Sequence, residues 1–190
     1  MPSSVASPGR RLTLMTRQVF VHDAPDRCIV GTVGEPGQRI FFLQVRSGSR
    51  INTLVLEKEQ AQILAERIDG LLDEMVGSDS PAAARDDGPL DSPIEEDFRV
   101  AALGLGWNSE TGRLIIEAHA PGADDTDVPD LENDDEGPDT VRIRLSADQG
   151  RAFAQRAQAV VAAGRPPCPF CHLPLDPTGH ICPRANGYRR

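Results

Sequence analysis

The sequence predicts an α+β protein whose two halves each combine an antiparallel β-sheet with one helix, followed by a small C-terminal knuckle. Three observations support this prediction. A helix-like segment occurs twice, short β-rich runs precede each copy, and three of the four cysteines lie close together near the C-terminus. The chain of 190 residues is long enough for one ordinary domain or for two small ones that share a core.

The segment that occurs twice predicts two amphipathic helices, over residues 58–76 and 147–163. Apolar residues recur on one face of each helix at the same spacing. The matching positions are Leu64, Ile68, Leu71 and Leu72 in the first copy and Phe153, Ala157, Val160 and Val161 in the second. Ser146 followed by Gln149 is typical of a capping box, and Gly164 with the prolines after it ends the second helix.

Short runs rich in β-branched and aromatic residues precede each helix, and turn residues separate them. They cover residues 18–22, 28–33, 40–45 and 51–56 in the first half and residues 98–107, 114–120 and 140–145 in the second. Each half is therefore expected to form three or four antiparallel strands followed by a helix. One shared sheet and two separate lobes would both cover the apolar faces, and the sequence leaves this choice open.

Two acidic segments separate and interrupt the halves, so the predicted organisation has five parts. They are a disordered N-terminus (1–14), a first half (15–76), an acidic linker (77–97), a second half (98–164) with a disordered acidic insert (122–139), and a C-terminal knuckle with a basic tail (165–190). Both acidic segments are poor in the apolar residues whose burial offsets the entropy of ordering a chain. We therefore expect little fixed structure in either.

The formal net charge of −9 comes from these acidic segments rather than from the body of the protein. No apolar run is long enough to span a bilayer, and no signal peptide is recognisable at the N-terminus. Cysteines that cluster within a short stretch are typical of metal binding in a reducing compartment. We therefore expect a cytoplasmic protein that does not enter membranes.

The C-terminal cysteines and one histidine predict a bound Zn²⁺. Cys168 and Cys171 lie in a Cys-x-x-Cys turn, and His180 and Cys182 follow after a second turn. Three thiolates and one imidazole supply the four tetrahedral ligands that structural zinc sites use. Because a full set of protein ligands leaves no open position, the ion is expected to stabilise a zinc-binding knuckle rather than to catalyse a reaction.

Other interpretations of these residues stay open. His172 could replace His180 as the fourth ligand, although it directly follows Cys171. The Cys-x-x-Cys pair could instead be a thioredoxin-like redox motif, but that motif begins a helix, which the surrounding prolines disfavour. The cysteines could also be free thiols.

The residues after the knuckle suggest how the protein acts. Arg184, Tyr188, Arg189 and Arg190 form a basic tail, which we expect to bind a protein partner. The chain would then be a non-enzymatic adaptor. Nucleic-acid binding through the same tail is a second hypothesis, which the few aromatic residues of the body do not favour.

A third hypothesis is an enzyme with a small-molecule site between the two halves. Glu117 and His119 share one face of a strand and are candidates for acid–base chemistry, together with the turn at residues 35–37. A solvated sheet face is the simpler interpretation of that pair. Cys28 is interpreted as a small buried side chain, and His22 as the end of a strand.

Four stretches of the chain carry a family resemblance. They are Arg17-Gln-Val-Phe, residues 31–39 with Phe42-Leu-Gln44, Leu64-Ala-Glu-Arg-Ile68, and Cys168-Pro-Phe-Cys171 with Cys182-Pro-Arg-Ala-Asn-Gly-Tyr-Arg-Arg190. Together they resemble an uncharacterised actinobacterial family, known as a domain of unknown function or a "repeat protein". The resemblance runs from about residue 15 to the end and is loosest in the acidic segments. It implies no activity and no catalytic residue.

Overall fold

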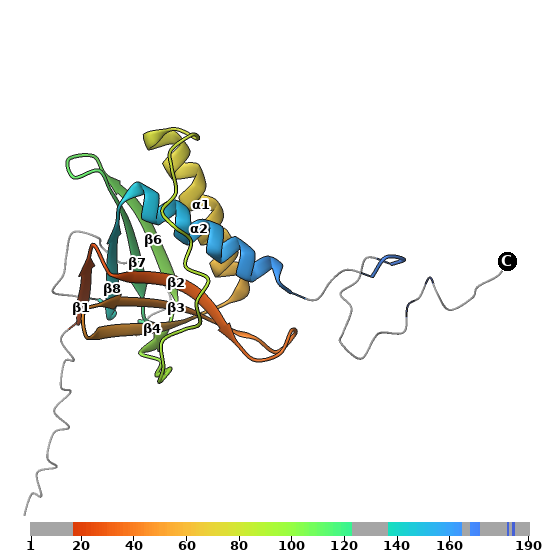
Figure 1. Ribbon diagram of the computed structural model, residues 1–190. Coiled ribbons are helices and arrows are strands. Elements are labelled where there is room, and N and C mark those ends of the chain that lie inside the picture. Colours follow the sequence, from red (N-terminus) through yellow and green to blue (C-terminus); the bar gives the residue numbers. More distant parts are fainter. Residues whose placement is uncertain (1–16, 123–136, 165–167, 172–181, 183, 185–190) are drawn as a thin grey trace, which may run out of the picture.

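The computed structural model describes residues 17–122, 137–164, 168–171, 182 and 184. Within them, each half of the chain contains four strands followed by one helix (Figure 1). The elements are β1 Val19–Asp23, β2 Arg27–Val33, β3 Ile40–Ser47, β4 Arg50–Leu56, α1 Lys58–Val76, β5 Phe98–Arg99, β6 Ala102–Asn108, β7 Arg113–His119, β8 Thr140–Leu145 and α2 Ala147–Ala162. The predicted α+β class, with its two sheet-plus-helix halves, is confirmed.

The strands form two four-stranded sheets that exchange strands, so neither the single shared sheet nor the two separate lobes that the sequence left open is formed. The first sheet has the order β2-β3-β4-β5, and the second has the order β1-β8-β7-β6. Each half therefore gives its first strand to the sheet of the other half. β1 pairs with β8, and β5 pairs with β4.

Both exchanged pairs are parallel, so the expectation of purely antiparallel sheets is wrong at these two positions. Strands joined by short hairpins must run antiparallel, as β2-β3-β4 and β6-β7 do. A strand that pairs with a partner from the other half is free of that constraint, because a long stretch of chain separates the two.

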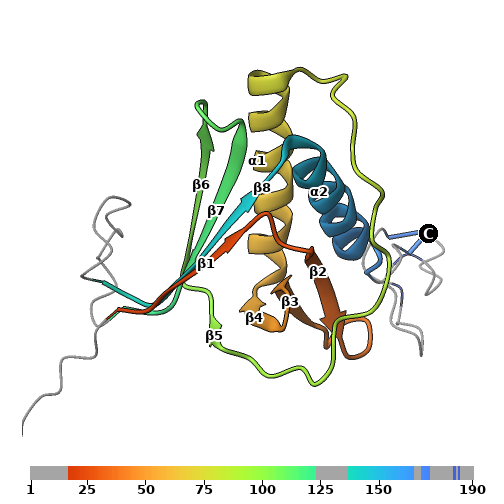
Figure 2. The same cartoon turned by 60° about the vertical axis from the view of Figure 1, so that its left-hand side comes forward.

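Both helices lie on the same side of the sheets and fill the angle between them (Figure 2). The main core takes side chains from both sheets and both helices, among them Leu43, Leu54, Ile68, Leu114 and Phe153. Close approach at the centre requires Gly150, where a Cβ atom would lie 2.9 Å from Leu114 Cδ2. The two halves therefore share one continuous core.

The two helices begin in the same way. The backbone N–H of Glu57 donates to Gln60 Oε1 at 2.9 Å, and the backbone N–H of Ser146 donates to Gln149 Oε1 at 3.0 Å. These contacts are the capping-box interaction expected for the second helix. In the part of the chain that the structure describes, neither helix combines the length and apolar character needed to cross a membrane.

Residues 77–97, which we call the strap, have fixed structure although the sequence predicted little. The strap leaves the end of α1, runs past α2 and around β2, and reaches β5 (Figure 2). Arg27 on β2 pairs with Asp86 at 2.6 Å and with Asp91 at 3.0 Å, and Leu90 is 9% exposed. The composition was misleading because arginines of the body neutralise these acids. The predicted disordered N-terminus (1–14), and all but the ends of the acidic insert, lie outside the described residues.

Candidate functional site

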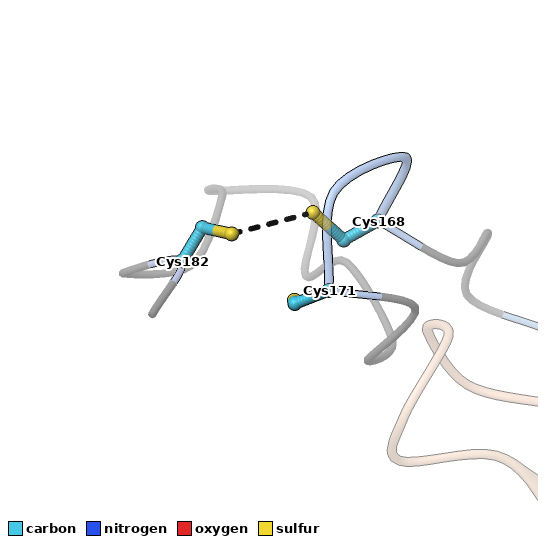
Figure 3. A group of neighbouring side chains, drawn as sticks. All are labelled: Cys168, Cys171 and Cys182. Atoms are coloured by element: carbon cyan, nitrogen blue, oxygen red, sulfur yellow. Dashed lines mark hydrogen bonds between the residues drawn. The ribbon is translucent and has the colours of Figure 1, made fainter. Parts of the chain in front are cut away.

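Three cysteines near the C-terminus come together in space. Cys168 and Cys171 belong to the Cys-x-x-Cys turn, and Cys182 approaches them from the following segment (Figure 3). Their three Sγ atoms all lie within 4.8 Å of one another. Cys168 and Cys182 are buried, and Cys171 is half-buried. The structure thus gathers three of the four residues predicted to hold a metal ion.

The distances between the sulfur atoms fit a metal site rather than a disulfide. Cys168 Sγ and Cys182 Sγ are 3.8 Å apart. Two thiolates bound to one tetrahedral zinc ion, at about 2.3 Å each, lie about 3.8 Å from each other, whereas disulfide sulfurs lie about 2.0 Å apart. The separation of Cys168 and Cys182 therefore suits two thiolates that bind one metal ion.

The turn also favours the ionised form of Cys168. Burial raises the pKa of this thiol, but hydrogen bonds from the backbone N–H groups of Cys171 and Phe170 and from neighbouring thiols lower it. The net effect is a pKa below the usual value. The thiolate is the form that binds metal ions.

The other predicted residues of this region are only partly described. His180, the predicted fourth ligand, and its alternative His172 lie outside the described residues. Arg184 Nη1 donates to the carbonyl oxygen of Phe170 at 3.2 Å, so this arginine touches the Cys-x-x-Cys turn. The remaining predicted partner-binding residues, Tyr188, Arg189 and Arg190, also lie outside the described part of the chain.

Glu117 and His119 on β7 are not the solvated pair that the sequence suggested. Glu117 is 5% exposed, and His119 is 2% exposed. Glu117 Oε1 accepts a hydrogen bond from Arg142 Nε, and His119 Nδ1 lies 2.9 Å from Thr140 Oγ1. Burial lowers the pKa of His119, although the nearby Glu117 opposes this. The pair is part of a buried polar cluster and does not face open solvent.

The structure does not bring the three candidate parts of an enzyme site together. The turn at residues 35–37 lies at the tip of the β2–β3 hairpin, whereas Glu117 and His119 belong to the second sheet (Figure 1). The hollow beside Glu117, of about 350 Å³, is lined by residues of β6, β7 and β8. A joint catalytic role for these residues has no geometric support.

Sequence reasoning missed the role of His22. This residue is fully buried, with Nδ1 2.8 Å from Ser47 Oγ and Nε2 2.8 Å from Asn52 Oδ1. It belongs to the second sheet but contacts residues of β3 and β4, so it joins the two sheets. Its position two residues after Phe20, on the same face of the strand, was a signal of burial. Cys28, which was predicted to be buried, is half-buried but packs against the core, and burial raises the pKa of its thiol to about 12.

The fold and the cysteine cluster together define an α+β protein with a candidate metal centre after its second helix. The chain belongs to the family described as "Protein of unknown function (DUF3090)", whose model matches residues 20–182. The match spans the two-sheet body and ends at the third cysteine of the cluster. No curated protein and no solved structure shows a significant match to the chain.

Proposed function

We propose that this protein is a non-enzymatic, zinc-containing adaptor of the cytoplasm. The observation that carries the proposal is the approach of three cysteine Sγ atoms to within 4.8 Å of one another. His180 is the fourth ligand in this proposal, and Arg184, Tyr188, Arg189 and Arg190 form the surface that meets a protein partner.

The donor set supports a structural role for the ion. Soft thiolates select zinc over magnesium or calcium, which prefer oxygen ligands. Three thiolates and one imidazole complete a tetrahedral shell, so no position is left for water or substrate. Such an ion would hold the Cys-x-x-Cys turn against the segment of Cys182 and present the basic tail in one orientation.

Metal analysis tests the zinc site. The full chain, purified without added metal, is expected to contain one zinc ion per molecule. Cys171→Ser is expected to remove it, because a neutral hydroxyl replaces a thiolate ligand. Cys28→Ser is the matched control, since Cys28 lies on β2 in the body of the protein. Full zinc content in Cys171→Ser would show that the assignment is wrong.

The partner surface is tested with the full chain as bait. Replacing Arg184, Arg189 and Arg190 by glutamine should abolish capture of a protein partner while leaving the zinc content unchanged. Retention that disappears after nuclease treatment would point to nucleic acid instead. Equal capture of the partner by the unaltered chain and by the arginine variant would remove the tail from the proposal and leave only the metal site.

A further inference from the structure

The three strands before each helix match in order and pairing, and this correspondence reveals a surface that only one of the two sheets fills. Leu56 ends β4 and Leu145 ends β8, each directly before a capped helix. The residues just before these leucines, Val55 and Arg144, are therefore equivalent. Across the paired strands, Phe42 and Gly31 in the first sheet then match Ile115 and Gly106 in the second. By the same pairing Gln44 corresponds to Glu117, and the helices align Arg156 with Arg67.

Around β2, the edge strand of the first sheet, this surface is filled by the strap. Arg156 donates to the carbonyl oxygens of Asp86 and Gly88 in the strap. Leu90 then lies over Gly31, where a Cβ atom would be only 2.7 Å from the leucine side chain. The strap therefore passes from the groove beside α2 to the outer face of the sheet.

Gln44 completes the attachment of the strap. Its side-chain oxygen accepts the backbone N–H of Asp91 at 2.7 Å, and its Nε2 donates to the carbonyl oxygen of Asp91 at 3.1 Å. The strap is thus held by main-chain hydrogen bonds, one leucine and acidic side chains. An extended peptide of similar composition can make all of these contacts.

Around β6, the edge strand of the second sheet, the equivalent surface is open. A Cβ atom at Gly106 would meet nothing within 4 Å, and the hollow over this glycine measures about 350 Å³. On the other side of β6, a groove of about 580 Å³ runs along α1 and includes Ile63, Arg67 and Leu105. Arg67 is exposed and forms no ion pair with the residues that the structure describes.

Glu117 occupies the position of Gln44 on this surface, but its carboxylate is engaged within its own sheet. The side chain is 5% exposed, Oε1 accepts from Arg142 Nε, and Oε2 lies 3.6 Å from His119 Nε2. The contact that Gln44 makes with the strap therefore has no counterpart at Glu117, and the other features of this surface must hold a ligand.

The edge of β6 is itself suited to pairing. The strand Ala102–Asn108 contains no charged residue and forms one edge of its sheet (Figure 2). Natural proteins usually protect such an edge with charges, proline or a covering segment. The equivalent edge strand, β2, is covered by the strap, whereas β6 has no cover in the part of the chain that the structure describes.

We propose that the surface around β6, from Arg67 over Gly106 to Arg144, binds an extended acidic peptide segment of a partner protein. In this complex Arg67 donates to backbone carbonyls, and a leucine-sized side chain lies over Gly106. The acidic character follows from charge, because Arg67 and Arg144 lie along this surface and β6 itself carries no acidic residue. This interaction does not depend on the metal site.

Trp107, the only tryptophan of the chain, lines the hollow and reports on binding directly. The probe is a synthetic peptide of residues 82–97, which carries the leucine and the acids of the strap. Titration into the full-length protein is expected to change the Trp107 fluorescence, with a Kd on the order of 10–100 μM, since one apolar side chain and a few hydrogen bonds are buried. The affinity should fall with added salt.

Three variants decide where the peptide binds. Gly106→Val fills the open space and should abolish the fluorescence change, and Arg67→Gln should weaken binding about tenfold. Val21 lies on the same face of the sheet, outside the hollow, so Val21→Ala should leave binding unchanged.

Absence of any binding would overturn the proposal. Binding that survives Gly106→Val would also overturn it, because the peptide would then be replacing the strap at β2. If the peptide binds Cys171→Ser but not the full-length protein, the zinc-held tail is the occupant and the proposal fails.

Discussion

Two buried histidines, His22 and His119, each place a ring nitrogen within hydrogen-bonding distance of a hydroxyl oxygen. Both rings are almost completely buried. Burial lowers the pKa of both, and it outweighs the opposing contributions of Asn52 and Glu117. Each histidine is therefore neutral in the folded protein at neutral pH.

These two pKa shifts predict that the protein is less stable in mild acid. The folded pKa values lie below 6.5, the ordinary value, so the unfolded chain binds more protons as the pH falls through that value. The free energy of unfolding should decrease between pH 7.5 and pH 5.5, by at most about 1.4 kcal/mol per pH unit for each histidine. Urea denaturation at several pH values measures this slope. Replacing both histidines by glutamine should flatten it, and an equal slope in that variant would contradict the assignment.

Two equivalent glycines are expected to respond oppositely to the same substitution. Gly31→Val should lower the free energy of unfolding by about 1–3 kcal/mol, because the new side chain collides with Leu90. Gly106→Val should be nearly neutral or stabilising, since its position is open and β-branched residues favour strands. Chemical denaturation of the two variants beside the unaltered protein tests the pair. A similar loss in both would show that the space over Gly106 is not open.

At the scale of elements, the strap shows how a segment of polar composition acquires fixed structure. Arg27 and Arg156 bind its carboxylates and carbonyls, and the backbone of Asp91 pairs with Gln44. The pKa of Asp86 is lowered to about 2, first by its hydrogen bond with Arg27. The contribution of Asp86 to stability is therefore complete above pH 3.8 and is lost as the pH falls toward 2.

Removing Arg156 is expected to release the strap. Its guanidinium joins the carbonyl oxygen of Val30 on β2, at 2.7 Å, to the carbonyl oxygens of Asp86 and Gly88. Arg156→Met should cost about 2–3 kcal/mol and should expose residues 77–97 to proteases, because buried carbonyls lose a charged donor. Arg67→Met is the matched control at the equivalent exposed position on α1 and should change stability by less than about 0.5 kcal/mol. Equal protease resistance of the strap in both variants would contradict its attachment through Arg156.

The exchange of β1 and β5 joins the halves at the same scale. Each sheet contains one strand from the other half, so neither half can complete its sheet alone. His22 adds a contact between the sheets, because it lies on β1 and reaches Asn52 on β4. The halves should therefore unfold together rather than as separate domains.

At the scale of the whole molecule, the main core and the cysteine cluster are separate. The core is formed by the two sheets and the two helices, and it contains none of the three clustered cysteines. The Cys-x-x-Cys turn follows α2 and lies beyond its end (Figure 1). Metal binding and folding of the body are therefore expected to be largely independent.

Removal of the metal tests this independence. A chelator is expected to leave the free energy of unfolding of the two-sheet body, measured with urea, unchanged within about 0.5 kcal/mol, while the thiols of the cluster become reactive. Cys28 should stay unreactive, because burial raises its pKa to about 12. Thiol titration and denaturation of the same sample measure both effects. Loss of the cooperative unfolding transition on chelation would show that the ion supports the core.

The sequence by itself determined the local elements and the candidate metal ligands. Apolar spacing placed both helices within one residue of their observed ends, and the capping residue Ser146 marked one start. Alternation and turn residues located the strands. The spacing of Cys168, Cys171 and Cys182 indicated a cluster that the structure brings together. These features depend on residues near one another in the chain, or on strong ligand chemistry, and both can be read locally.

Only the tertiary structure decided which strands pair between the halves and which polar groups are buried. The exchange of β1 and β5, the burial of Glu117 and His119, and the attachment of the strap all depend on partners far away in the sequence. A carboxylate that reads as solvated is buried once Arg142 lies beside it on the next strand. An acidic segment that reads as disordered is held once Arg27 and Arg156 face it. The energies of such contacts exist only after folding has brought the partners together, so local composition could not reveal them.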